Sequence, residues 1–266
     1  MTETWKTAIT QIKPNEIRLR GYRIDELMGR VTFAQAIYLA LCGDLPSPNV
    51  GRLIDAMLVS SIDHGVTPPS TQAARLTAST GAPLNAAVAT GVLSINRHHG
   101  GAIESCMDVL RRLIEFAAES GKSLEAAAPD IILEFKAAKK KIAGFGHRVH
   151  THDPRTGKLL SLATELGLAG NGVAAVRALE AAFAASGKPL PVNVDGAIAA
   201  LLIDLGFLPE LGNAFFIMAR VPGLVAQVYE EQRRQPPMRR IDPRESEYDG
   251  PPARGMMNDT MMNDER

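Results

Sequence analysis

Three histidines, an acid and several bases follow a Gly-Phe-Gly turn in the stretch GFGHRVHTHDPRTGK, residues 144 to 158. Imidazole and carboxylate side chains gathered in one short run are the groups that bind metal ions or transfer protons. Positions 147, 150 and 152 do not share one face of a helix or a strand, and the HExxH spacing of a zinc site is missing. These residues alone therefore leave three interpretations: a metal site, a solvated loop or the edge of an active site.

A second histidine cluster, NRHHGGAIES, precedes a predicted helix. The paired glycines after His99 let the backbone approach a ligand closely, and the helix N-terminus behind them favours negative charge. A neutral imidazole at this place could hydrogen-bond to a developing oxyanion. A capping loop with an incidental histidine explains the same residues. His64, in SSIDHGVTPPS, either interacts with the last carbonyls of a helix or contacts a ligand.

Charged residues in apolar surroundings form a third group. Asp195, in PLPVNVDGAIAALLIDLG, directly precedes a predicted helix, so it is either an N-cap or a carboxylate base in a pocket. Arg220 lies in the apolar stretch FFIMARVPGLV and needs an anionic partner, supplied by the protein or by a substrate. Residues 139–141 are lysines that either end a helix or contact phosphates of a nucleotide-like ligand. The arginines of residues 233–240 are expected on a solvated surface.

Helices must position these groups. Alanine and leucine dominate, aromatic residues make up 5%, and alternating patterns are scarce, which favours helix. Thr32 with Gln35 has the pattern of a capping box, Ser123 is a predicted N-cap, and Pro222 is predicted in the first turn of the last helix. The predicted helices cover residues 32–43, 101–121, 123–141, 158–167, 172–187, 196–206 and 222–234, and one short strand covers 16–24.

Composition argues against several classes of protein. The 266 residues include 29 acidic and 29 basic side chains, so net charge gives no attraction to nucleic acid or to anionic membranes. Cys42 and Cys106 lack CxxC spacing, which argues against a disulfide framework or a structural zinc site. The start, MTETWKTAIT, does not resemble a secretory signal, and no apolar run reaches the roughly 18 residues of a membrane helix. We expect a soluble, cytoplasmic protein without nucleic-acid or membrane partners.

Taken in chain order, five segments resemble motifs of the citrate synthase superfamily. They are EIRLRGYRIDELMGRVTFAQAIYLALCGDLP, HHGGAIE, GFGHRVHTHDPR, VNVDGAIAALLIDLGF and MARVPGLVAQVYEE. The resemblance covers most of the chain and implies an all-α, citrate synthase-like fold, in which a small helical domain closes over the active site. Residues 1–100 and 191–240 would form the large domain and residues 101–190, approximately, the small one. Residues 241–266, rich in Pro, Asp, Asn, Arg and Met, are expected to form an extended or disordered arm.

The resemblance also implies roles for individual residues. His99 matches the histidine that hydrogen-bonds the acetyl-CoA thioester oxygen, His147 the one that polarises the carbonyl of the oxo acid, and Asp195 the base that deprotonates the acetyl methyl group. Further matching groups would bind the substrate carboxylates (His64, Arg155, Arg220) and CoA (Lys140, Lys141, Gly144, Phe145, Gly146). Arg240 resembles the arginine that a second subunit donates, which implies a homodimer. No metal is implied, and no cofactor besides the CoA thioester substrate.

Two departures from the common family pattern favour cleavage. Only residues 47–59 separate GDLP from SSIDHG, where the usual citrate synthases carry several helices, and this looks like a compact citryl-CoA lyase. Gly196, after Asp195, resembles the lyase module of ATP-citrate lyase. We therefore expect reversible cleavage of citryl-CoA to acetyl-CoA and oxaloacetate. A citrate synthase or 2-methylcitrate synthase that releases free CoA is the alternative, and a non-catalytic metal- or ligand-binding homologue is a third interpretation.

Overall fold

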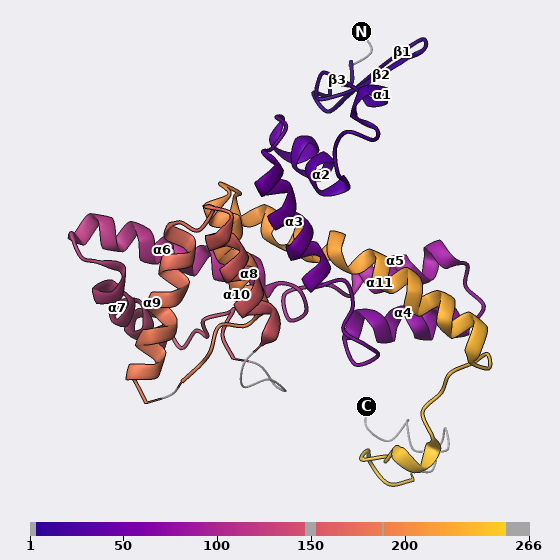
Figure 1. Cartoon of the computed structure of the whole chain (residues 1–266). Helices are drawn as coiled ribbons and strands as arrows, with labels where there is room; N and C mark the ends of the chain where they lie inside the picture. The colour runs from indigo at the N-terminus through magenta and orange to yellow at the C-terminus, as the bar shows by residue number, and fades with distance from the viewer. Residues whose placement is uncertain (1–3, 147–152, 188, 254–266) are drawn as a thin grey trace, which may run out of the picture.

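The computed structural model describes residues 4–146, 153–187 and 189–253, and it confirms the prediction of a mostly helical chain (Figure 1). The sheet among these residues is a small antiparallel one near the N-terminus, with strands β1 (Thr10–Lys13), β2 (Glu16–Leu19) and β3 (Tyr22–Arg23) in that order. The strand predicted over 16–24 is therefore two strands with a turn between them. No sequence pattern predicts β1, because its four residues are all exposed and show no alternation of apolar and polar side chains.

Helices make up the rest of the regular structure. They are α1 (Ile24–Leu27), α2 (Phe33–Cys42), α3 (Pro48–Ser60), α4 (Pro69–Ser79), α5 (Leu84–Leu93), α6 (Ala102–Ser120), α7 (Leu124–Ala137), α8 (Pro154–Glu165), α9 (Asn171–Ala185), α10 (Val194–Asp204) and α11 (Gly212–Arg234), with the 3-10 turns η1 (Pro209–Leu211) and η2 (Pro243–Glu245). The predicted capping box of α2 and the Ser123 cap of α7 are both present. Local sequence signals therefore set these helix starts.

Helices α1, α3, α4 and α5 lie outside the predicted ranges, and three predicted helix boundaries are wrong. Helix α8 begins at Pro154 rather than at residue 158. The last helix begins at Gly212, so Pro222 lies inside α11 rather than in its first turn. The helix tolerates the missing N–H because it is packed on both sides of the proline: Ala219 and Leu224 are buried, and a Cβ on Gly223 would lie 2.0 Å from the carbonyl oxygen of Ile62. Helix α7 ends at Ala137, so residues 139–141 follow the helix instead of forming its last turn.

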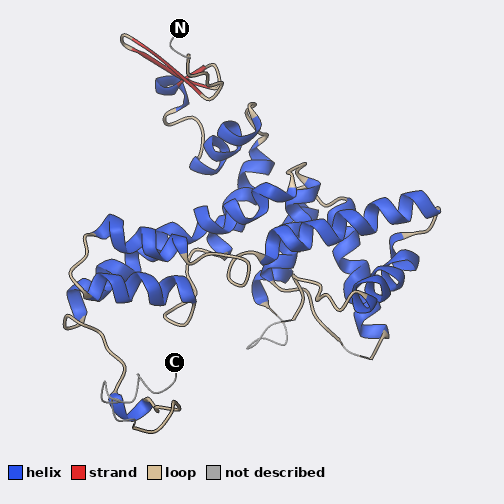
Figure 2. Ribbon diagram, turned by 180° about the vertical axis from the view of Figure 1, so that it is seen from behind, coloured by secondary structure: helices blue, strands red, loops and turns tan. Residues whose placement is uncertain are grey.

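Helices α1 and α2 lie with the small sheet toward the N-terminus, and the helices that follow form two lobes on either side of α3 (Figures 1 and 2). In one lobe, α10 packs against α6, α8 and α9, and α7 packs against α6 and α9; this lobe holds the larger hydrophobic core. In the other lobe, α4, α5 and the C-terminal half of α11 enclose a smaller core of alanines, Leu224 and Val228. Helix α11 contacts α6 as well as α4 and α5, so it connects both lobes.

The division into a large domain (1–100 with 191–240) and a small domain (101–190) stays a prediction. Of the C-terminal arm predicted over 241–266, the structure describes residues 241–253, which are exposed with the exception of Asp242 and contain only the turn η2 as regular structure. Residues 254–266 lie outside the described part of the chain.

One segment of the described chain, Pro209–Arg234, is long and apolar enough by length and composition to cross a membrane. The buried core helix of a soluble protein passes the same test. This segment also carries two buried charged residues, Arg220 and Glu231, and packs against four other helices. We therefore interpret it as the central packing helix of the fold.

The start of α9 gives a first testable prediction, for stability. Its N-cap, Gly170, has no capping side chain, and Asp204 at the end of α10 accepts hydrogen bonds from the backbone N–H groups of Gly170 (2.8 Å), Gly172 (2.6 Å) and Val173 (3.0 Å) instead. We expect Asp204→Ala to lower the free energy of unfolding by about 1–2 kcal/mol, because these donors lose their acceptor. Denaturant unfolding measures this, with the exposed Asp55 on α3 changed to alanine as the matched control. Equal effects of the two substitutions would contradict the prediction.

Candidate active site

The N-terminus of α10 presents a carboxylate that does not cap its own helix. Asn193 is the N-cap, and its side chain accepts a hydrogen bond from the backbone N–H of Gly196 at 3.1 Å. Asp195 is the second residue of the helix, so the N-cap interpretation of this aspartate is wrong. With capping supplied by Asn193, the Asp195 side chain remains available for other contacts. It is partly buried, and the loss of solvation raises the pKa of its carboxyl group.

The Gly-Phe-Gly segment lies directly against this helix start. Gly144 and Gly146 hydrogen-bond to the chain just before α10: Asn193 N–H donates to the Gly144 carbonyl (3.0 Å), Asn193 Nδ2 donates to the Gly146 carbonyl (2.8 Å), and Gly146 N–H donates to Pro191 (2.7 Å). A Cβ on Gly196 would lie 2.2 Å from the Gly144 carbonyl oxygen. Glycine at position 196 therefore allows the two segments to approach this closely.

The start of α8 adds an acid–base pair on the same side. The buried carboxylate of Asp153 accepts hydrogen bonds from Arg155 Nε (3.0 Å), Arg155 Nη2 (2.8 Å) and the Arg155 backbone N–H (3.0 Å). Burial disfavours the charge of Asp153, but the hydrogen bonds from Arg155 outweigh it and lower the pKa of Asp153; the backbone N–H of Val194 acts in the same direction. Asp153 thus fixes the Arg155 guanidinium beside the start of α10.

Arg220, in the middle of α11, is a buried cation whose hydrogen bonds are incomplete. Its Nε donates to the carbonyl of Ser61 at 3.0 Å, and its guanidinium carbon lies 4.7 Å from the centre of the Phe216 ring. Its Nη1 is buried and has no hydrogen-bond partner among the described residues, and no ion pair of Arg220 is found there. Burial lowers the pKa of Arg220, while the charges of Asp63 and Asp195 raise it. An anionic ligand would satisfy this group.

The end of α3 holds both arginines. Arg155 Nη1 donates to the carbonyl of Ser60 at 3.2 Å, and Arg220 Nε donates to the next carbonyl along, that of Ser61. Helix α3 ends at Ser60, and the C-terminus of a helix carries partial negative charge that attracts cations. One helix end therefore brings two guanidinium groups from α8 and α11 into one place.

His99 reaches the same region from the loop before α6. Its Nε2 lies 2.7 Å from the hydroxyl oxygen of the buried Ser70 at the start of α4, and its ring meets the Phe216 ring edge-on with 5.5 Å between centres. Burial, then the charges of Arg220 and His64, lower the pKa of His99. The ring is therefore neutral at neutral pH. Gly100, with φ of +85°, makes room for Phe216, because a Cβ there would lie 2.7 Å from a ring carbon.

Several predicted site residues therefore converge around Arg220. Its charge acts on Asp195 and on His99, and Arg155 acts on Asp195 as well. His64 is exposed, and its charge also acts on His99. The arrangement provides a carboxylate with a raised pKa, a neutral imidazole and two fixed guanidinium groups, all from different helix ends. Such a set can move a proton to or from a carbon acid while it binds a substrate with several carboxylates.

Other predicted residues are placed differently. His147 lies outside the described residues. Lys140 and Lys141 are exposed in the loop after α7, with Gly144, Phe145 and Gly146 following toward α10, and their contact with CoA stays a prediction. Arg240 lies beyond the C-terminus of α11, at the opposite end of the helix from η1 and α6. In the described part of the chain no group of three or more His, Cys, Asp or Glu residues could hold a metal ion.

Three residues of the site did not stand out from the sequence as contributors. The sequence pattern gives Asp153, the acid of the GFGHRVHTHDPRTGK stretch, no role of its own, whereas in the structure it holds Arg155. The Asp-Pro-Arg spacing, with an acid capping a helix that starts at proline, is the signal that predicts such a pair. Ser70 and Phe216 lie 29 residues before and 117 residues after His99 in the chain, so that no local pattern connects them to it.

This helical fold, with acid, imidazole and guanidinium groups meeting at the ends of separate helices, defines an enzyme of the citrate synthase-like class. The model of the "Citrate synthase, C-terminal domain" matches residues 45–243. The chain belongs to the citrate synthase family.

Individual relatives resemble the chain to different extents. A structure of citryl-CoA lyase from Hydrogenobacter thermophilus is 45% identical, with a TM-score of 0.86, and the match covers 96% of this chain and 98% of that one. A structure of ATP citrate lyase from Methanosaeta concilii with (3S)-citryl-CoA is 22% identical, with a TM-score of 0.78, covers 98% of this chain and 43% of that one, and supports the fold alone. "Citrate synthase 2" of Bacillus subtilis is 30% identical over 82% of this chain and 56% of its own length. The chain spans about half the length of the curated citrate synthases that it matches.

Proposed function

We propose that the protein cleaves citryl-CoA reversibly into acetyl-CoA and oxaloacetate. The observation that carries the proposal is the pair of guanidinium groups, Arg155 and Arg220, that hydrogen-bond to the end of α3 and whose charges act on Asp195 at the start of α10, a carboxyl group with a raised pKa. A tricarboxylic acyl group needs several cations, and a carbon acid needs one placed base. The likeness to a citryl-CoA lyase over nearly the full length of both chains supports the choice of substrate.

The chemistry assigns one step to each group. His147 takes the hydroxyl proton of citryl-CoA, the carbon–carbon bond breaks to give the ketone of oxaloacetate and the enolate of acetyl-CoA, and Asp195 protonates the enolate carbon. His99 donates a hydrogen bond to the enolate oxygen. In the tautomer with its proton on Nδ1, the neutral His99 ring accepts a hydrogen bond from the Ser70 hydroxyl at Nε2 and donates from Nδ1 to the enolate oxygen. Neither water nor any cofactor besides the CoA thioester enters this reaction.

The proposal extends to the assembly and the setting of the protein. Arg240 lies at the far end of α11 from the start of that helix, so its predicted contact with a substrate carboxylate is made in a partner subunit of a homodimer. Arg155, Arg220 and His64 bind the other carboxylates, and the segment of residues 140–146 binds CoA. The protein acts in the cytoplasm, where CoA thioesters are available as substrates.

The direct test is incubation of the purified full chain with citryl-CoA, with acetyl-CoA and oxaloacetate followed over time. Equal amounts of the two products, without free CoA, are the expected result. In the reverse direction, acetyl-CoA and oxaloacetate should give citryl-CoA without a rise in free thiol. A protein that is inactive in both directions would contradict the proposal.

A citrate synthase is the second candidate, because the matching curated relatives with 27–31% identity are named citrate synthases. A synthase also hydrolyses the citryl-CoA thioester, so acetyl-CoA and oxaloacetate would release free CoA in proportion to citrate. Propionyl-CoA as the acyl donor tests for 2-methylcitrate formation in the same assay. Thiol detection separates these outcomes from simple cleavage.

Gly196 gives a second testable prediction. We expect Gly196→Ala to cost about 1–3 kcal/mol of stability and to lower kcat by up to about 100-fold, because the new methyl group pushes the Gly144 carbonyl away from the start of α10. Two alanine substitutions serve as controls in unfolding and steady-state assays. Gly157 has no heavy atom within 4 Å of an added Cβ, so neither stability nor kcat should fall; at Gly172 the added Cβ lies 2.2 Å from the carbonyl oxygen of Ala200, so only stability should fall. A similar loss of kcat at positions 172 and 196 would contradict the prediction.

A further inference from the structure

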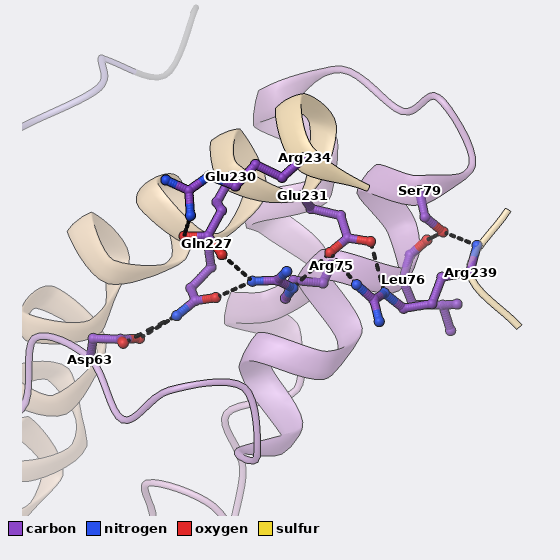
Figure 3. Close-up of polar contacts among 9 residues, drawn as sticks. All are labelled: Asp63, Arg75, Leu76, Ser79, Gln227, Glu230, Glu231, Arg234 and Arg239. Carbon is purple, nitrogen blue, oxygen red and sulfur yellow. Dashed lines mark hydrogen bonds and ion pairs between the residues drawn. The ribbon is translucent and has the colours of Figure 1, made fainter. Parts of the chain in front are cut away.

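A buried carboxylate on α11 joins two arginines that lie far apart in the chain (Figure 3). Glu231 is 1% exposed, and it accepts hydrogen bonds from Arg75 Nε of α4 (2.7 Å) and from both Nε and Nη2 of Arg239 (2.7 Å each). Hydrogen bonds from Arg239 lower the pKa of Glu231 against the effect of burial, and the charge of Arg75 adds to this. The carboxylate is thus ionised and holds both guanidinium groups at once.

This cluster fixes the chain that follows α11. The helix ends at Arg234, and Met238 adopts a positive φ of 61°. The backbone there is hydrogen-bonded to the end of α4: Met238 N–H donates to the Ser79 carbonyl (2.7 Å) and Arg239 N–H to the Ser79 hydroxyl (3.1 Å). Together with the hydrogen bonds from the Arg239 side chain to Glu231, these contacts fasten residues 238 and 239 to α4 and α11.

The next residue in the chain is Arg240. It is exposed, and none of the described residues forms a hydrogen bond or ion pair with its side chain. Residues 235–240 and Glu231 line a hollow of about 440 Å³. The structure therefore holds one arginine of the Arg239–Arg240 pair tightly and leaves the neighbouring guanidinium exposed.

The same cluster extends to the candidate active site of its own chain. Arg75 Nη1 donates to Gln227 Oε1 at 2.6 Å, and Gln227 Nε2 donates to the carboxylate of Asp63 at 3.1 Å (Figure 3). Asp63 is in turn the acidic group with the largest effect on Arg220. A continuous chain of polar contacts thus joins Asp63, beside Arg220, to Arg239, beside Arg240.

We propose that Glu231 is a positioning residue that, through Arg239, holds Arg240 in place for the carboxylate of a substrate bound in the partner subunit. This inference rests on the proposed function and on its homodimer. A merely structural role would instead fasten residues 236–240 to the protein without any effect on substrate binding. The two roles differ in one respect: positioning acts only through Arg240, whereas fastening does not depend on it.

A double-mutant cycle with the full-length protein separates the two roles. KM and kcat for citryl-CoA are measured for Glu231→Gln, Arg240→Ala and the double variant, with thermal unfolding recorded for each. We expect each single substitution to raise KM by about tenfold to a hundredfold with a smaller change in kcat, since misplacement of a binding group has effects of this size. The double variant should bind no more weakly than Arg240→Ala alone.

Arg239→Ala provides a second route to the same test, because its side chain is 44% exposed and its removal leaves Arg75 paired with Glu231 in the core. Arg234→Ala is the matched control: this exposed arginine of α11 pairs with Glu230 at 3.7 Å and should leave KM unchanged. The inference is overturned if Arg240→Ala leaves KM unchanged. It is also overturned if Glu231→Gln or Arg239→Ala raises KM by the same factor in the Arg240→Ala background as in the wild-type protein. An inactive wild-type protein would overturn the proposed function instead.

Discussion

Asp195→Ala is expected to lower the rate of citryl-CoA cleavage by about 10²- to 10⁴-fold, the range that a placed acid–base group contributes. Asn193, rather than Asp195, caps α10, so the substitution removes a reacting group and leaves the helix start intact. Exchange of the acetyl-CoA methyl protons with solvent isolates the step, because it needs the base but not the break of the carbon–carbon bond. In Asp195→Ala, the exchange of the methyl protons should be lost together with the cleavage of citryl-CoA.

The control for this prediction is Asp108→Ala, on the exposed side of α6, which should leave both rates unchanged. Asp195→Asn adds a stability measurement. Burial raises the pKa of Asp195 in the folded protein above its ordinary value of 3.8. The folded protein therefore loses stability as the pH rises from this ordinary pKa to the raised one, and the loss persists at higher pH. The asparagine variant should therefore be more stable than wild type at neutral pH, and the gain should shrink in acid. Methyl-proton exchange at the wild-type rate in Asp195→Ala would exclude Asp195 as the base.

Arg220→Met is expected to weaken substrate binding by about 2–5 kcal/mol, which is a rise in KM of roughly 30-fold or more. The guanidinium is buried, its Nη1 has no partner among the described residues, and a substrate carboxylate would complete its hydrogen bonds. The free protein should not lose comparable stability, since burying this cation already costs free energy that the methionine side chain does not. KM and denaturant unfolding measured together test both statements.

The pH profile of the same variant carries a second signature. Arg220 is one of two cations that lower the pKa of Asp195, so its removal raises that pKa further. Because Asp195 must be ionised to deprotonate acetyl-CoA, the acidic limb of the condensation profile should move to higher pH. Arg220→Lys keeps the positive charge but lacks the planar guanidinium group. It should return the acidic limb of the pH profile to its wild-type position and restore only part of the affinity for substrate. Arg52→Met, at an exposed arginine of α3, is the control; a loss of activity there comparable to that at Arg220 would show that the effect is not specific to the site.

Much of the fold follows from short-range signals. The capping box at Thr32, the cap at Ser123 and the glycines at helix ends lie within one helical turn of what they control, so the sequence alone locates α2, α6 and the start of α7 closely. Pro222 is different: its local preference for a first turn is overridden by burial on both sides of α11. A local rule fails where tertiary packing supplies more free energy than the rule.

The residue types of the site were also legible in the sequence, since Asp195, His99, Arg155 and Arg220 were each singled out for their chemistry and order. The resemblance implied their roles, but the residues by themselves left alternatives open. Whether Asp195 caps its helix or faces a substrate depends on Asn193, and whether Arg220 has a partner in the protein depends on which carbonyls end α3. Ser70 and Glu231 make their contacts with residues distant in the chain. The sequence by itself determined the helical class, the helices with clear caps and the candidate residues by type, but not α3, α4 and α5; only the tertiary structure decided the partners of these residues, because burial and charge act through space between chain segments that no local pattern connects.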